Sequence, residues 1–188
     1  MRKIWIGIVK LCGWKFDIPD QKERPEVQRC VVAVAPHTSI ADFFIGAAVM
    51  MAAGVNLRIF MKKEFFNWFS TPILTHFGVI PVDRGNRSNH LVERAVEEFA
   101  KNDRISIALT PEATRKPVKR FKRGFYEIAT KANVPIMLGY IDFKEKRAGY
   151  GPTIIPSGDY DADMAKIIEF FAPVHAKHPE GWYWGAEH

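Results

Sequence analysis

The sequence predicts an α/β fold: a single domain with a largely parallel or mixed central sheet covered by helices, preceded by an amphipathic N-terminal helix. Three observations indicate this class. Short apolar runs alternate with segments of helical periodicity, the 188 residues fit one domain, and 47% apolar residues are enough for one core. No internal repeat or low-complexity tract is present in the sequence.

The predicted strands are short apolar runs bounded by polar residues, glycine or proline, at residues 31–35, 57–61, 79–82, 105–109, 136–141 and 153–155. Helical spacing of apolar residues predicts helices at 91–99, 124–132 and 162–171, and residues 40–53 form a nearly all-apolar helix that ends at Gly54. Residues 65–77 are predicted to be an aromatic-rich helical stretch whose path changes near Pro72. Residues 17–29 contain two prolines and are predicted to be a connection without regular structure.

Residues 1–16, MRKIWIGIVKLCGWKF, combine an apolar helical stripe with four cations. This composition is typical of a helix that lies in the interface of an anionic bilayer, although the same helix could instead cover the protein's own core. We divide the chain into this segment, expected at the membrane surface, and a main domain at 17–188. Lys10 interrupts the apolar part, which disfavours a signal peptide. No stretch reaches the roughly 18 apolar residues of a membrane-spanning helix.

The chain carries 27 Lys and Arg against 21 Asp and Glu, a net charge of +6, and this balance favours anionic partners. Cys12 and Cys30 have no CxxC spacing, so neither a disulfide framework nor a zinc site is indicated. The sequence thus predicts a reducing, cytoplasmic setting, with peripheral attachment to the inner face of the cell membrane.

Three polar clusters follow or end predicted strands: HTSIAD at 37–42, GVIPVDR at 78–84 and PEATR at 111–115. Open α/β sheets build their sites where strands end, so the three clusters are expected to meet there. His37 and Asp42 are spaced so that the carboxylate can orient one imidazole nitrogen and leave the other as a base. Thr38 and Ser39 are candidate nucleophiles, but both lie where a helix cap is expected, and capping is the commoner use.

Arg84 and Arg115 follow neighbouring strands, and their guanidinium groups match phosphate oxygens in two-point contacts. The alternative is a structural ion pair, for example between Arg84 and Glu112. Residues 115–123 then contain six cations, which usually mark a solvated loop. No nucleic-acid-reading motif accompanies this loop, so a lipid phosphate or a phosphorylated carrier is favoured over nucleic acid.

Together the clusters resemble the motifs of the lysophospholipid acyltransferase family. HTSIAD matches the HxxxxD block, GVIPVDR the second block that ends in arginine, and PEATR the PEGTR block. FKRG at 121–124 resembles the segment after that block, VPI at 134–136 the fourth block, and Lys62 with Glu64 the KxE element. The resemblance covers about residues 30 to 140. Three departures are Ala113 in place of glycine, Thr110 in place of an aromatic residue, and the missing second proline of the fourth block.

The resemblance implies a transfer of an acyl group from acyl-CoA or acyl-ACP to a lysophospholipid hydroxyl without an acyl-enzyme intermediate. It implies that His37 is the base and Asp42 its orienting acid. The remaining substrate-binding residues that it implies are Lys62, Arg84 and Arg115 at the acceptor phosphate, Glu112 at the glycerol backbone, and Thr114 in the same block. Ala113 narrows the pocket in this interpretation, so the acceptor could be one other than 1-acyl-glycerol 3-phosphate.

Neither a permanently bound cofactor nor a metal is expected. His175 and His178 could seat two ligands on one helical turn, but flanking prolines disfavour such a site. The aromatic tail, residues 181–185, is interpreted as a capping lid, with a second membrane anchor as the alternative. Two further alternatives are transfer to a lyso-aminolipid or to glycerol 3-phosphate, and a peripheral protein that binds phospholipid without catalysis.

Overall fold

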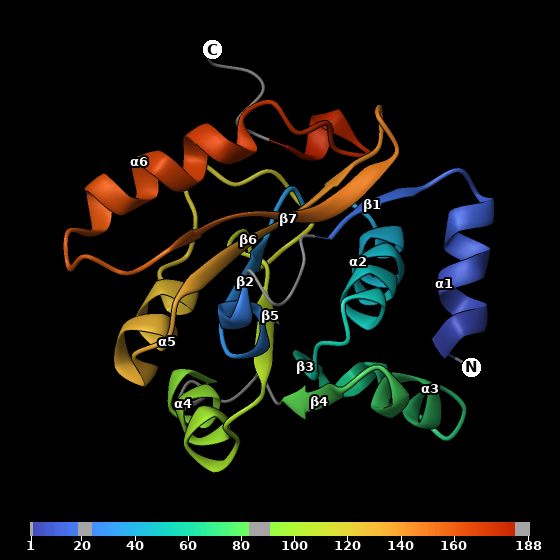
Figure 1. Cartoon of the computed structure of the whole chain (residues 1–188), viewed down its shortest axis with the longest axis horizontal. Helices are drawn as coiled ribbons and strands as arrows, with labels where there is room; N and C mark the ends of the chain where they lie inside the picture. The colour runs from blue at the N-terminus through green and yellow to red at the C-terminus, as the bar shows by residue number, and fades with distance from the viewer. Residues whose placement is uncertain (1, 19–23, 83–90, 183–188) are drawn as a thin grey trace.

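A seven-stranded sheet in the order β1-β7-β6-β2-β5-β3-β4 runs through the protein in this computed structural model (Figure 1). The structure describes residues 2–18, 24–82 and 91–182. The strands are β1 (Lys15–Asp17), β2 (Val31–Val34), β3 (Leu57–Lys62), β4 (Val79–Val82), β5 (Ser106–Leu109), β6 (Ile136–Asp142) and β7 (Arg147–Ile154). β2 to β6 pair in parallel, whereas β7 pairs antiparallel to β6 and parallel to β1. The predicted mixed α/β class is therefore confirmed.

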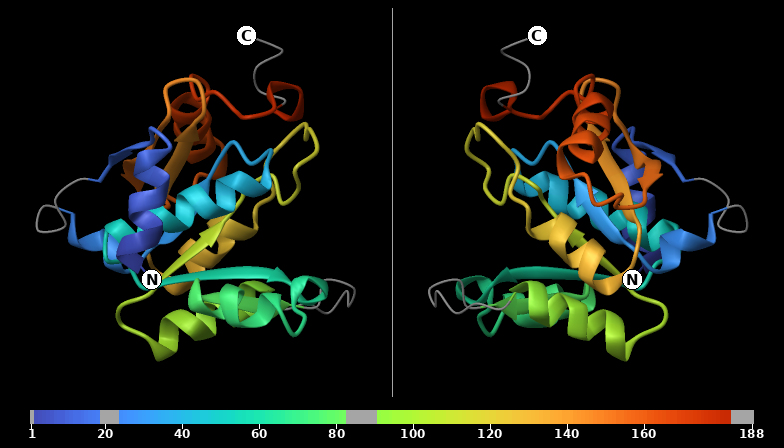
Figure 2. Two further views of the ribbon diagram at one scale, coloured as in Figure 1. Left: turned by 90° about the vertical axis from the view of Figure 1, so that its right-hand side faces the viewer. Right: turned by 90° about the vertical axis from the view of Figure 1, so that its left-hand side faces the viewer.

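The helices connect the parallel strands and cover both faces of the sheet (Figure 2). They are α1 (Arg2–Leu11), α2 (Ile40–Ala52), α3 (Ser70–His76), α4 (Leu91–Lys101), α5 (Gly124–Ala132) and α6 (Tyr160–Phe171), with short 3-10 helices η1 (Pro25–Gln28), η2 (Lys63–Phe65) and η3 (Pro179–Gly181). In the described residues, no helix is both long and apolar enough to cross a bilayer.

The alternation of side chains along β2 divides the core into two layers. Val31 and Ala33 point into the cluster formed with α4, α5 and α6, while Val32 points into the cluster formed with α1 and α2. All three residues are fully or almost fully buried. Because both faces of β2 are buried, its sequence is a continuous apolar run and does not alternate between apolar and polar residues.

Gly78 allows β4 to start beside β3. Its φ is +73°, and a Cβ atom at this position would lie 2.1 Å from the carbonyl oxygen of Leu57. No other residue type fits such an approach, because the clash is with backbone. The glycine that opens the GVIPVDR cluster therefore has a structural function at the start of the strand.

Four predictions of local structure were wrong. The N-terminal helix ends at Leu11, and β1 begins at Lys15 inside the segment 1–16. Residues 17–29 include the end of β1 and the 3-10 helix η1. The helical stretch predicted at 65–77 is interrupted at residues 66–69 and not near Pro72. Pro72 lies in the first turn of α3, where backbone N–H groups have no partner within the helix, so a proline is tolerated there.

The last of these errors concerns β7, which spans Arg147–Ile154 where only residues 153–155 were expected. Its sequence, RAGYGPTI, has no apolar run, so local pattern does not reveal it. Pairing with β6 on one side and β1 on the other holds the strand. The two cysteines are free: Cys12 is exposed and Cys30 is buried, and burial raises the pKa of Cys30 to about 12.

Candidate active site

The polar clusters leave the sheet at one edge. Since β2, β3, β4 and β5 are parallel, their carboxyl ends lie on the same side of the sheet. β5 lies between β2 and β3, so the PEATR cluster that follows β5 neighbours both the HTSIAD cluster after β2 and Lys62 at the end of β3. The strand of the GVIPVDR cluster, β4, is next to β3 at the sheet margin.

His37 and Asp42 lie together at the start of α2. Nδ1 of His37 is 3.2 Å from Oδ2 of Asp42, and the same oxygen accepts the backbone N–H groups of Thr38 and Ser39 at 2.9 Å each. Asp42 stands in the first turn of α2, where the helix dipole favours a negative charge. The Asp42 side chain is 3% exposed and that of His37 is 23% exposed. The carboxylate is therefore enclosed while the imidazole reaches the surface.

The two hydroxyl residues beside His37 have structural contacts. Oγ of Ser39 accepts the N–H of Ala41 at 2.9 Å and caps α2, as expected. Oγ1 of Thr38 accepts the N–H of His178 at 3.2 Å, which is a contact with the C-terminal segment and not a helix cap. Both residues are buried. These contacts hold the hydroxyls in the scaffold around His37.

Glu112 connects the first and third clusters. Its two carboxylate oxygens each lie 3.0 Å from the backbone nitrogen of His37, which donates to them. Glu112 is 3% exposed, and this burial, helped by the negative charge of Asp42, raises its pKa to about 8 against the lowering effect of the His37 N–H. A carboxyl group with this pKa carries a proton at neutral pH in most molecules.

The rest of the PEATR cluster forms a closed turn. Ala113 has a φ of +57°, in the left-handed region that disfavours residues with a Cβ atom. Its N–H donates to the carbonyl of Thr110, and the N–H of Lys122 donates to the carbonyl of Pro111, so the loop returns to its own start. Oγ1 of Thr114 accepts the N–H of Lys116 at 3.2 Å. Its predicted part in substrate binding stays a prediction.

Of the three cations predicted to bind phosphate, the structure describes two, Lys62 and Arg115. Both are exposed, and neither side chain forms an ion pair or hydrogen bond with another described residue. Arg84 lies outside the described residues, and so does any ion pair between it and Glu112. The expectation that Arg84 and Arg115 follow neighbouring strands was wrong, because β3 separates β4 from β5 in the sheet. Lys62 ends β3 and Arg115 lies in the loop after the adjacent β5, and two exposed cations so placed are compatible with an anionic ligand at this edge.

The C-terminal segment lies next to the site, and the sequence did not reveal this contact. Beyond the bond from His178 to Thr38, a Cβ on Gly181 would lie 3.1 Å from the Thr38 methyl group and 3.4 Å from the Arg115 carbonyl oxygen. Trp182 is 7% exposed and its ring lies 6.1 Å from that of Phe121. The aromatic tail was the available signal. Its first two residues pack against the scaffold, while residues 183–185 lie outside the described part of the chain.

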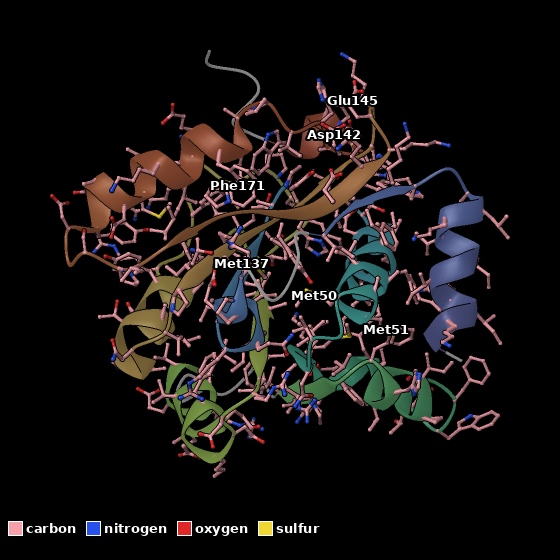
Figure 3. All side chains as sticks on the ribbon, in the orientation of Figure 1. Met50, Met51, Met137, Asp142, Glu145 and Phe171 are labelled. Atoms are coloured by element: carbon pink, nitrogen blue, oxygen red, sulfur yellow. The ribbon has the colours of Figure 1, made fainter. Side chains whose placement is uncertain are left out.

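The histidines at 175 and 178 do not share a helical turn, because α6 ends at Phe171. Nδ1 of His175 lies 2.9 Å from Oδ2 of Asp142, the last residue of β6. Figure 3 shows Asp142 beside Glu145, whose N–H donates to it. His178 approaches Glu180 at 3.5 Å instead. Across the described ranges, no group of three or more His, Cys, Asp or Glu side chains is arranged to hold a metal ion.

Comparison with known proteins supports the family resemblance. The crystal structure of the 1-acyl-sn-glycerophosphate (LPA) acyltransferase PlsC from Thermotoga maritima is similar over 90% of this chain and 75% of the other, with a TM-score of 0.62 and 15% sequence identity. No curated protein sequence matches the chain. The likeness to PlsC shows a shared fold.

The acyltransferase family model matches residues 16–140, which is about two thirds of the chain and includes all three polar clusters. The matched range contains β2 to β5, most of β1 and β6, and every residue from His37 to Arg115. The expected family is thereby confirmed, and the chain belongs to the acyltransferase family.

Proposed function

We propose that this acyltransferase moves a fatty acyl group from a thioester donor, acyl-CoA or acyl-ACP, to the hydroxyl of a lysophospholipid such as 1-acyl-glycerol 3-phosphate. The observation that carries the proposal is the His37–Asp42 pair at the strand-end edge, with its 3.2 Å contact and its partly exposed imidazole. A buried carboxylate that orients an accessible histidine is the arrangement required to activate a hydroxyl group.

In the proposed reaction, Nδ1–H of His37 donates to Asp42, which leaves Nε2 to take the proton of the acceptor hydroxyl. The acceptor oxygen attacks the thioester carbonyl carbon and forms a tetrahedral intermediate. Its collapse breaks the C–S bond, and the imidazolium returns the proton to the thiolate, so the products are an ester and a free thiol. The acceptor itself is the nucleophile, and both hydroxyls beside His37 are already engaged in structural contacts.

Acceptor recognition is assigned to the neighbouring strand ends. Lys62 and Arg115, with Arg84, would bind the phosphate of the acceptor, because cations that follow β3, β5 and β4 at one edge of the sheet can share one dianion. Glu112 would position the glycerol backbone. Burial raises the pKa of its carboxyl group to about 8, and in its protonated form that group can donate a hydrogen bond to an oxygen of the glycerol backbone.

The proposed setting is the inner face of the cell membrane, to which the protein attaches peripherally through its N-terminal helix. The chain's +6 net charge favours an anionic surface. We propose that the reaction uses no permanently bound cofactor and no metal, because proton transfer and orientation by His37 supply the chemistry.

The test is thiol release from acyl-CoA and from acyl-ACP, measured with a panel of acceptors: 1-acyl-glycerol 3-phosphate, a lyso-aminolipid and glycerol 3-phosphate. We expect the greatest kcat/KM with 1-acyl-glycerol 3-phosphate as the acceptor, and no thiol release by folded His37→Ala. Preference for either of the other acceptors would replace the proposed substrate while keeping the mechanism. Release that persists in His37→Ala would overturn the mechanism, and phospholipid binding without release from any donor would favour the non-catalytic alternative.

A further inference from the structure

The large apolar side chains on the surface gather in two segments of the chain. Of the nine that are exposed in the described residues, seven lie on α1 or between residues 63 and 76. These seven are Ile4, Ile8, Leu11, Phe65, Trp68, Phe69 and Ile73, and we call them the apolar face. Scattered apolar residues need no explanation, whereas a concentration of this kind indicates an interaction surface.

The two segments meet at an apolar groove. A groove of about 420 Å³ lies between them, with Ile4 and Ile8 of α1 on one side and Ile73 and Phe77 of the α3 region on the other. Met51 of α2 also lines it, and Figure 3 shows this side chain at the end of α2 near α3. Both α1 and α3 face the viewer in the left panel of Figure 2. The apolar face therefore spans two elements that are far apart in the sequence.

α1 has an inner apolar stripe as well as an outer one. Val9 is 6% exposed, and Nε1 of Trp5 donates to the carbonyl of Phe44, so this side of the helix packs on α2. Ile4, Ile8 and Leu11 follow at helical spacing on another side, and Leu11 is 89% exposed. The two interpretations of this helix are thus compatible, because one stripe covers the core and the other stays available.

The segment from 63 to 76 presents its apolar residues without such an inner function. Phe65, Trp68 and Phe69 lie at the break between η2 and α3, and Trp68 is 90% exposed. The rings of Trp68 and Phe69 contact each other, with centroids 6.0 Å apart. A paired Trp and Phe at a turn is well shaped to enter the headgroup region of a bilayer, where tryptophan is favoured.

The charges around the apolar face select an anionic bilayer as its partner. Lys3 and Lys10 are exposed on α1, which contains no acidic residue, and Lys62 is exposed where the second segment begins. Glu64 is the only acidic residue between 57 and 82. An apolar centre framed by cations is complementary to acyl chains framed by anionic headgroups.

We propose that α1 and residues 63–76 form a two-part membrane-docking face, in which Trp68 and Phe69 enter the interface of an anionic bilayer beside the outer stripe of α1. Residues 63–76 begin at the carboxyl end of β3, the same sheet edge from which His37 emerges. Docking through this segment brings that edge close to the lipid surface. The inference rests on the proposed function, because it names the surface through which the enzyme reaches a lipid acceptor.

The test uses the full chain and sedimentation with phosphatidylcholine vesicles, with and without phosphatidylglycerol. Trp68→Ala should lower the partition coefficient on anionic vesicles by on the order of tenfold, since a large apolar side chain is removed from the interface. Ile155→Ala is the matched control, because Ile155 is 79% exposed but lies outside the apolar face, and it should bind like the wild type. Lys3→Gln with Lys10→Gln should weaken binding to anionic vesicles only, by about fivefold per cation.

A second measurement locates the side chain itself. Vesicles of brominated lipid should quench tryptophan fluorescence in the wild type, and Trp68→Phe should remove most of that quenching while it retains much of the binding. Trp68→Ala should also keep its turnover of a short-chain, water-soluble acceptor and lose turnover of an acceptor embedded in vesicles. This separation follows because the substitution leaves the His37–Asp42 pair untouched.

Equal vesicle binding by Trp68→Ala and the wild type would overturn the proposal. So would a dimer of the wild type in sedimentation velocity that Trp68→Ala dissociates, because the apolar face would then be an interface between copies. The two levels of inference fail separately. Vesicle binding through Trp68 without thiol release would refute the proposed function alone, and thiol release from a protein that binds no vesicles would refute the docking face alone.

Discussion

The carboxyl group of Glu112 is hydrogen-bonded to the backbone N–H of His37, with both of its oxygens 3.0 Å from that nitrogen. This contact joins the loop after β5 to the loop after β2, two strands that are adjacent in the sheet. The candidate base is therefore fixed from two sides, by Asp42 at its ring and by Glu112 at its backbone.

Glu112→Gln should change how stability depends on pH. The carboxyl group has a pKa of about 8 in the folded protein and an ordinary value near 4.5 when unfolded, so the folded state binds more protons between these values. The free energy of unfolding of the wild type should therefore fall, relative to Glu112→Gln, as pH rises from about 4.5 to about 8, by at most about 1.4 kcal/mol per pH unit. Urea unfolding of both proteins at pH 5, 7 and 9 measures this difference. A difference that does not vary with pH would contradict it.

Asp42→Asn should lower kcat strongly while the protein stays folded. The amide can still accept the N–H groups of Thr38 and Ser39, but it cannot stabilise an imidazolium at His37, and orienting acids of this kind contribute up to ~10⁴ in rate. Loss of charge at the α2 N-terminus should cost about 0.3–1 kcal/mol of stability. Steady-state kinetics and urea unfolding check both parts. The loss should be no greater than that of His37→Ala, and turnover close to the wild type would exclude Asp42 from the mechanism.

Arg115→Gln should discriminate between acceptors. If Arg115 binds the acceptor phosphate, the variant should lose about tenfold or more in kcat/KM with phosphate-bearing acceptors and much less with uncharged ones. The same selectivity is expected of Lys62→Gln and Arg84→Gln. Lys119→Gln is the control, since Lys119 is exposed in the same basic loop but has no assigned part in binding. Equal losses on both kinds of acceptor would mean that the arginine is structural.

Ala113→Gly should stabilise the protein. Ala113 has a φ of +57°, which costs an alanine about 1–2 kcal/mol, whereas glycine adopts this φ freely. Glycine also makes the unfolded chain more flexible, and this lowers the free energy of unfolding by about 0.5–1 kcal/mol. The expected net effect is a gain of up to about 1.5 kcal/mol, measured by urea unfolding. Ala132→Gly, at the end of α5, provides the contrast and should destabilise. A loss in Ala113→Gly as large as in this control would show that the loop does not store the strain.

Local sequence determined the bounds of elements that are well buried and whose end residues favour a strand or helix terminus. β4 and α5 have the predicted bounds, and α2 ends beside Gly54, whose φ of +70° suits a helix terminus. The cap at Ser39 was also predictable, because a capping side chain contacts the backbone two or three residues away. In such cases the residues that interact are neighbours in the chain, and their order alone fixes the outcome.

Tertiary structure decided the contacts between distant residues. The bond between His37 and Glu112 joins positions 75 residues apart, and that between Thr38 and His178 joins positions 140 apart. Neither can be derived from periodicity, because each depends on β5 being placed next to β2 and on the C-terminal segment returning to that edge. The apolar face has the same origin. Sequence identified the amphipathic α1, but only the packing of α1 on α2 and beside α3 left Ile8 and Ile73 on opposite sides of one groove.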